Sequence, residues 1–191
     1  DEPGSGRWVG ISNTADNPQY TCPSAKIMPL KAVSVPANKT DLRNLIDSLN
    51  PDGFTAGHIG AAWGWYMVSP NWQSVWPAES RPRDASPDVL KAVLLMTDGA
   101  FNTAYFGGNK NGEDYTIAHS SGGQALSLCQ NMRDAGLVVF TVAFDAPSDA
   151  ETLLQLCAGN ASSAFAASSA SELNAKFRQI GERLSMLRVA K

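Results

Sequence analysis

The stretch VLLMTDGAFN, residues 93–102, decides the fold and raises the first functional question. A run of apolar residues ends abruptly in Thr97, Asp98 and Gly99. Apolar strands that do not alternate with polar residues are usually buried on both faces, as in the parallel sheets of α/β proteins. Ligands of such proteins bind beyond the carboxyl ends of the strands, and Asp98 follows such an end. For an isolated Asp-Gly pair, an ordinary turn is the simpler interpretation.

Further strands and helices alternate along the chain on both sides of this stretch. KIMPL at 26–30 is a candidate short strand, cut by Pro29. Residues 89–97 form an apolar strand, LVVFTVAF at 137–144 is another one without alternation, and SAFAA around Phe165 predicts a further short one. Helical patterns occur at about residues 40–49, 57–69, 125–135, 148–157 and 169–187. Gly136 is expected to end the helix before the strand at 137–144. This order predicts an α/β fold, an open and mostly parallel sheet flanked by helices on both faces.

Capping residues predict where several of these helices begin. Thr40 is a natural N-cap for the first helix. Ser148 and Glu151 have the spacing of a capping box, and so do Ser169 and Glu172.

Composition bounds the class of protein. The 191 residues suit one domain, preceded by an irregular, Gly-, Pro- and Asn-rich arm at residues 1–25, so that the domain spans 26–191. The net charge of −3 argues against a nucleic acid or an anionic membrane as partner. No apolar run approaches the roughly 18 residues of a membrane span, so any membrane anchor is expected upstream of Asp1.

Three cysteines leave one without an internal partner. Cys129 and Cys157 lie on neighbouring predicted helices and can pair with each other. Cys22 is then either free or bonded to a residue outside this chain. Three buried, reduced thiols remain the alternative.

The helix at 57–69 carries small residues on one side, which predicts close approach to a neighbouring element: Gly57, Gly60, Ala61 and Gly64. We assign Trp63 of this helix to the core. Trp72 and Trp76, in the loop that follows, are candidates for a partner-binding surface. His58 is expected to pack against its neighbours or to face solvent.

Two motifs resemble those of von Willebrand factor type A domains. Asp98 matches the Asp of the family's TDG signature, and GFTAGHIGAAWGW at 53–65 is similar to the loop that carries the metal-binding Thr, here Thr55. The resemblance implies a metal-ion-dependent adhesion site. In such a site a hydroxyl, a carboxylate and waters hold Mg²⁺ or Ca²⁺, and a partner's carboxylate completes the shell.

The likeness extends over residues 25–190 and is more specific than the TDG signature alone. Several segments, in this order, resemble the C-terminal portion of TadG-like proteins of the bacterial Tad/Flp pilus system: FTAGHIGAAWGWYMVSPNW, VLLMTDGAFN, LCQNMRDAGLVVFTVAF, LLQLCAG and ELNAKFRQIGERLSMLR. This implies an exported module, periplasmic or at the bacterial cell surface. It would assist pilus assembly or adhesion by binding a protein or surface partner, pilus components among them.

One motif of the type A family is missing. The family's D-x-S-x-S segment follows the first strand of the sheet, whereas DASPD at 84–88 ends in Asp88 and precedes a strand. The resemblance therefore implies that the first strands lie upstream of this chain. A site made of Thr55 and Asp98 alone should bind metal weakly or not at all.

Two further function classes stay open. One is a metal-free structural scaffold of the same fold. The other, ranked last, is a metal-assisted hydrolase at Asp98, which needs further ligands there. The chain has no nucleophile elbow, Walker loop or Rossmann glycine pattern, so we expect no enzyme.

Overall fold

The computed structural model describes residues 25–50, 55–101 and 120–189. Its elements, in chain order, are α1 (Pro36–Asp47), α2 (Gly57–Val68), the 3₁₀ helices η2 (Pro70–Val75) and η3 (Ala78–Ser80), β1 (Ala92–Thr97), α3 (Ser121–Asp134), β2 (Val138–Phe144), α4 (Ser148–Ala158), β3 (Ala164–Ala167) and α5 (Ala170–Val189). Among the helices of these ranges, none has the length and apolar composition needed to span a membrane.

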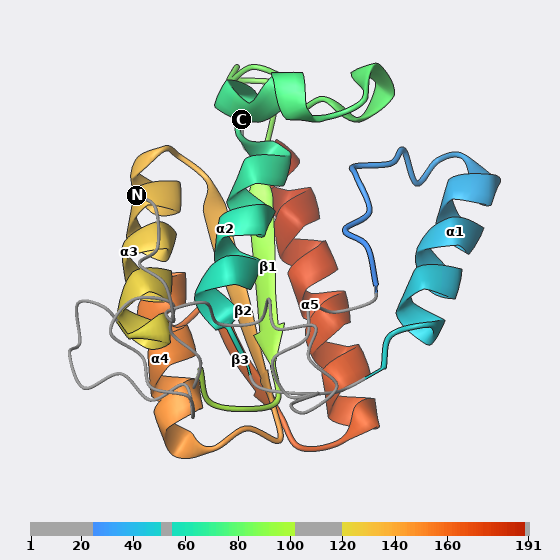
Figure 1. The fold of residues 1–191 in the computed structure, drawn as a ribbon. Helices are drawn as coiled ribbons and strands as arrows, with labels where there is room; N and C mark the ends of the chain where they lie inside the picture. The colour runs from blue at the N-terminus through green and yellow to red at the C-terminus, as the bar shows by residue number, and fades with distance from the viewer. Residues whose placement is uncertain (1–24, 51–54, 102–119, 190–191) are drawn as a thin grey trace, which may run out of the picture.

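Within the described residues the three strands form one parallel sheet in the order β1-β2-β3. Ala92 of β1 is opposite Val138, and Thr141 of β2 is opposite Ala164. Helices α3 and α4 cross between successive strands, and α2 packs beside α3, whereas α5 contacts β3 and β2 from the other face (Figure 1). The predicted α/β fold with an open parallel sheet and helices on both faces is confirmed.

The core lies on both faces of the central strand β2. Five consecutive residues of this strand are buried, Val139, Phe140, Thr141, Val142 and Ala143, as the absence of polar alternation predicts. Toward α3 and α4, Val139 packs with Cys129 and Cys157, and toward α5, Phe140 and Val142 pack with Ile180. The buried hydroxyl of Thr141 donates a hydrogen bond to the Leu154 carbonyl at 3.0 Å, so its polar atom is satisfied.

Small residues let α2 lie close to the sheet, as predicted. Ala61 is fully buried, and a Cβ added at Gly64 would lie 3.1 Å from Val93 of β1. Gly60 does not contribute, because a Cβ there would meet nothing within 4 Å.

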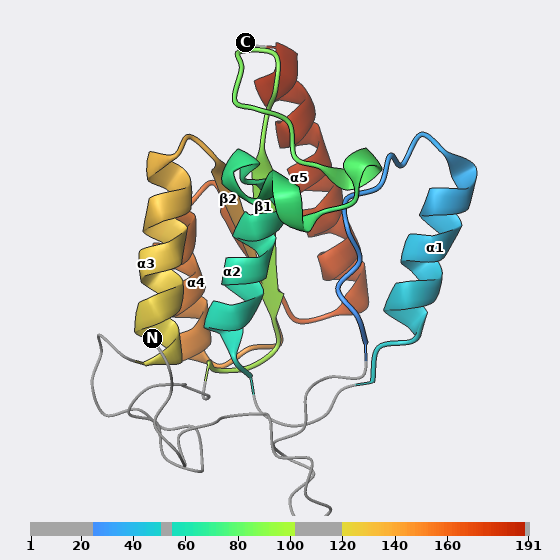
Figure 2. The ribbon, with the colours of Figure 1, turned by 45° about the horizontal axis from the view of Figure 1, so that its top comes forward.

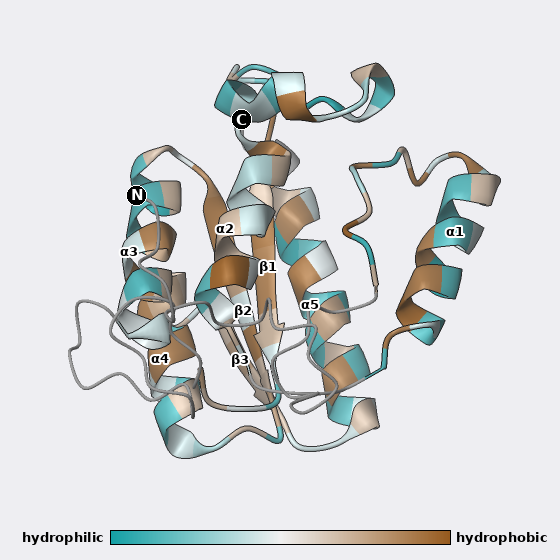
Figure 3. Cartoon of the chain, in the orientation of Figure 1, coloured by the Kyte–Doolittle hydropathy of each residue, from teal (hydrophilic) through white to brown (hydrophobic). Residues whose placement is uncertain are grey.

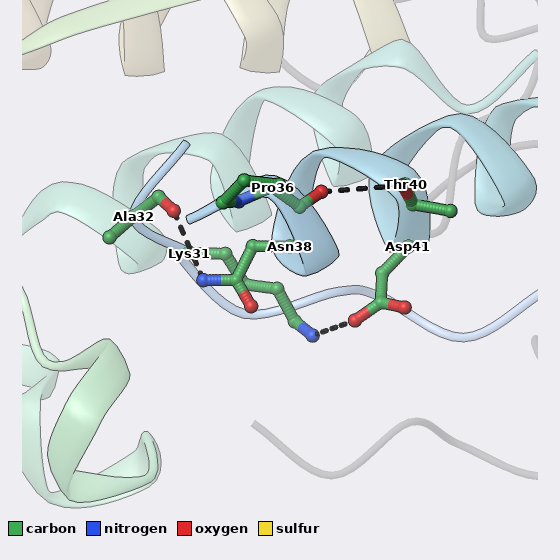
Figure 4. Close-up of polar contacts among 6 residues, drawn as sticks. All are labelled: Lys31, Ala32, Pro36, Asn38, Thr40 and Asp41. Atoms are coloured by element: carbon green, nitrogen blue, oxygen red, sulfur yellow. Dashed lines mark hydrogen bonds and ion pairs between the residues drawn. The ribbon is translucent and has the colours of Figure 1, made fainter. Parts of the chain in front are cut away.

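Two of the predicted helix starts are wrong. Helix α1 begins at Pro36, four residues before Thr40, because the fixed φ of proline suits the first turn. Thr40 is inside the helix and donates to the Pro36 carbonyl at 3.3 Å (Figure 4). The N-cap of α4 is Pro147, which has no side-chain acceptor, and Ser148 is the first helical residue.

Two other helix ends match the sequence. The backbone N–H of Glu172 donates to Ser169 Oγ at 3.3 Å, while the carboxylate of Glu172 accepts from the Ser168 N–H at 2.8 Å. The Ser168 hydroxyl also donates to this carboxylate, at 3.0 Å. The two bonds from Ser168 lower the pKa of the Glu172 carboxyl. At the end of α3, Gly136 has φ of 79° and the Leu137 N–H bonds the Met132 carbonyl at 3.0 Å, which closes the helix as predicted.

Helix α1 stands apart from the sheet and is tied to the segment before it. Lys31 Nζ lies 2.7 Å from an Asp41 oxygen, and the Asn38 side-chain amide donates to the Ala32 carbonyl at 3.0 Å (Figure 4). None of its residues is buried. Hydrophobic residues still gather along one side of it (Figure 3). They are Leu42, Leu45 and Ile46, with Leu49 two residues past the end of the helix.

Strand β1 is an edge strand of the described sheet. It pairs with β2 on one side, and its residues carry no charge. Val93 and Thr97 are buried toward α2, but Leu94 and Met96 on the opposite face are 40% and 43% exposed. The side chains of this strand are apolar on both faces, but the described residues bury only one of them.

Candidate functional site at the carboxyl edge of the sheet

Asp98 follows β1 directly and is exposed at the carboxyl edge of the sheet. The turn beneath it is held by Thr97, whose buried hydroxyl accepts a bond from the Gly99 N–H at 3.2 Å. The carboxylate thus projects from a fixed turn at the end of a strand, which is where open α/β sheets bind ligands.

Thr55 reaches the same edge from another segment. It precedes the first turn of α2, which begins at Gly57 beside the end of β1 (Figure 1 and Figure 2). The ring of Phe101, three residues after Asp98, lies only 2.2 Å from where a Cβ on Gly57 would be. A side chain at position 57 would have to displace this ring, and the two segments that carry Thr55 and Asp98 are in contact.

The first turns of α2 and α3 are joined by a buried hydrogen bond. His58 Nδ1 lies 2.8 Å from Ser121 Oγ, and both side chains are buried. Ser120 caps α3 by accepting from the Gly123 N–H at 2.9 Å. The sequence left two alternatives for His58, packing against neighbours or facing solvent, and the first is found. Its partner was not predicted, because the two residues are 63 positions apart.

Burial lowers the pKa of His58 below its ordinary value, so the folded protein favours the neutral imidazole. In the unfolded chain the same residue takes up a proton as the pH falls through about 6.5. The unfolded state then binds more protons than the folded state, and stability falls as the pH drops.

We therefore expect the wild type to lose more stability between pH 7.5 and 5.5 than the variant His58→Gln, whose amide does not titrate. Urea denaturation at both pH values measures the difference. The carboxylates are common to both proteins and cancel in the comparison. An equal loss in the two proteins would mean that His58 is not held neutral by the fold.

Metal binding at this edge stays a prediction. Thr55 and Asp98 offer two of the roughly six to eight oxygen ligands that Ca²⁺ takes. Across residues 25–50, 55–101 and 120–189, there is no group of three or more His, Cys, Asp or Glu side chains that could hold a metal ion. A second exposed carboxylate on the same edge is Asp145, which follows β2 with a left-handed φ of 49°. No motif in the sequence singles out Asp145.

The tryptophans lie near the far end of α2. Trp76 is buried and its indole N–H donates to the Tyr66 carbonyl at 2.8 Å, so it supports the local structure. Trp72 is 38% exposed and stacks on Tyr66 with ring centroids 3.9 Å apart, so of the two it is the one that a partner can contact. The assignment of Trp63 to the core is wrong, because it is 36% exposed and Trp65 packs against the core instead.

The predicted disulfide is present. Cys129 of α3 and Cys157 of α4 are bonded, with Cα atoms 5.2 Å apart and both side chains fully buried. Arg133 Nη1 donates to the Cys157 carbonyl beside the bond. Cys22 lies outside the described residues, as do residues 102–119 between Asp98 and α3.

Comparison with known proteins adds no family. No family model matches the chain, and no curated protein matches it. Among solved structures, the chain is similar to proximal thread matrix protein 1 (PTMP1) from the mussel byssus, crystal form 2, with 17% identity and a TM-score of 0.40. The match covers 80% of this chain and 29% of that one. Similarity at this level carries no conclusion about function.

Proposed function

We propose that this chain is the C-terminal part of a type A-like adhesion or assembly module, exported by a bacterium and acting in the periplasm or at the cell surface. It resembles TadG-like proteins in sequence, and we propose the same role in Tad/Flp pilus assembly or adhesion. The observation that carries the proposal is the contact between Phe101 and Gly57. That contact joins the turn of Asp98 to the start of α2, which follows Thr55 in the chain, at the carboxyl edge of a parallel sheet.

A divalent cation is the proposed link to the partner. A hydroxyl and a carboxylate are hard oxygen ligands of the kind that Mg²⁺ and Ca²⁺ prefer. The remaining positions would be filled by water, by ligands from the missing D-x-S-x-S segment, and by an acidic group of the partner protein or surface.

We further propose that the missing strands of the type A sheet pair with the edge of β1 that no described strand covers. An unpaired edge of apolar, uncharged residues is a liability that proteins normally cover. A strand beside β1 would satisfy its backbone groups. It would also extend the sheet on the side where Leu94, Met96 and the apolar stripe of α1 are uncovered.

The test is attachment and piliation of a producing bacterium whose gene carries Asp98→Ala. We expect surface attachment to fall roughly tenfold or more, the effect of losing about 1.4 kcal/mol of binding. EDTA should reduce attachment of the wild type to the same level. The matched control is Asp88→Ala, because Asp88 is also exposed but lies before β1, away from the carboxyl edge.

Normal attachment and piliation after deletion of the gene would exclude the proposed role. A defect on deletion, combined with normal behaviour of Asp98→Ala and no effect of EDTA, would instead identify the metal-free scaffold of the same fold.

A further inference from the structure

A groove runs between α2 and α3 on their outer side, with a volume of about 530 Å³. Its principal lining residues are His58, Ile59, Trp63 and Tyr66 of α2 and Gln124 and Ser127 of α3. The volume is within the range of about 300–1,000 Å³ of small-molecule sites. None of the described lining residues is an acid, a lysine or an arginine, so the described walls of the groove offer no counter-charge to an ionic ligand.

An aromatic platform forms one wall of the groove. Trp63 is partly exposed there, while its ring is braced edge-on by Tyr66 at 5.7 Å and by Trp76 at 6.1 Å between centroids. Trp76 is itself fixed by its bond to the Tyr66 carbonyl. A tryptophan held in this way can present a ring face to a ligand with little loss of side-chain entropy.

His58, which lines the groove, has one ring nitrogen without a hydrogen-bond partner among the described residues. His58 is only 7% exposed, and its Nδ1 is used by Ser121. In the part of the chain that the structure describes, no group bonds Nε2. Buried polar groups are normally satisfied, so this nitrogen calls for a water or a ligand. Depending on the tautomer, Nε2 either donates or accepts, and a hydroxyl group can match both.

We propose that this groove binds a neutral sugar residue, with its ring stacked on Trp63 and one hydroxyl bonded to His58 Nε2. A pyranose has an apolar C–H face for the indole and neutral hydroxyls for His58 and Ser127. The absence of charged lining disfavours phosphorylated and acidic ligands. The inference goes beyond the proposed function, because the sugar site does not use Thr55, Asp98 or a cation.

The test is saturation-transfer NMR and titration calorimetry with glucose, galactose, mannose and N-acetylglucosamine, all in EDTA. We expect at least one sugar to bind with a Kd of about 1 mM. Trp63→Ala should weaken binding roughly tenfold or more. The matched control is Phe177→Ala, because Phe177 of α5 is an aromatic residue of nearly the same exposure that does not line the groove, and this variant should bind the sugar as well as the wild type.

A second variant, Ala62→Phe, fills the groove while keeping Trp63, and it should also abolish sugar binding. It provides the test if Trp63→Ala does not fold. Asp98→Ala should bind the sugar normally, which separates this result from failure of the metal site. The inference is overturned if none of the four sugars binds, if both groove variants bind as well as the wild type, or if Phe177→Ala has the same effect as Trp63→Ala.

Discussion

Reduction of the Cys129–Cys157 disulfide is expected to lower the free energy of unfolding by about 3–4 kcal/mol. The bond closes a loop of 28 residues that contains the end of α3, all of β2 and most of α4. Opening this loop restores conformational entropy to the unfolded chain. Since domains of this size have a total stability of about 5–15 kcal/mol, the loss is a large part of it.

The measurement compares urea denaturation of oxidised and reduced protein in a Cys22→Ala background, so that the two samples differ only in this bond. Both cysteine side chains are fully buried, so the reduction has to be carried out in denaturant before refolding. Mass spectrometry of unreduced protein reports the bond directly. Equal midpoints with and without the bond would show that it adds nothing to stability.

The sheet was predictable because the signal for its strands is local. β2 and β3 were expected within about one residue of where they lie, and β1 begins three residues later than expected, at Ala92. The short strand expected at residues 26–30 is wrong, because that segment is irregular. β1 and β2 look alike in sequence, yet only β2 is buried on both faces. Burial depends on neighbours, and the sequence of a strand does not say whether those neighbours belong to the same chain.

The contacts between helices were not predictable for the same reason. The assignment of Trp63 to the core failed because two tryptophans two residues apart point in different directions, and only the position of β1 decides that Trp65 faces inward. Likewise, nothing local to His58 indicates Ser121. By contrast, Asp98 and Thr55 could be selected because each belongs to a motif that the resemblance identifies, although neither carries information about the other's position.

Replacement of Phe140 by alanine is expected to destabilise the fold by about 3–5 kcal/mol, the cost of deleting a fully buried aromatic ring. Phe140 is only 2% exposed at the centre of β2, and it packs with Val142 and Ile180 where α5 joins the sheet. Its ring centroid lies 6.4 Å from that of Phe165 on β3. The resulting cavity would be bounded by strands on one side and a helix on the other, so it cannot collapse easily.

The matched control is Phe177→Ala on α5, where the same side chain is 40% exposed and its loss should cost less than about 1 kcal/mol. Phe140→Leu keeps most of the volume and should fall between the two, at up to about 1.5 kcal/mol. Chemical denaturation of the three variants gives the order directly. Equal losses for Phe140→Ala and Phe177→Ala would contradict the assignment of the second half of the core to the β2–α5 contact. In the proposed adhesion module the β2–α5 contact also matters for function, because β2 pairs with β1 and Asp98 directly follows β1.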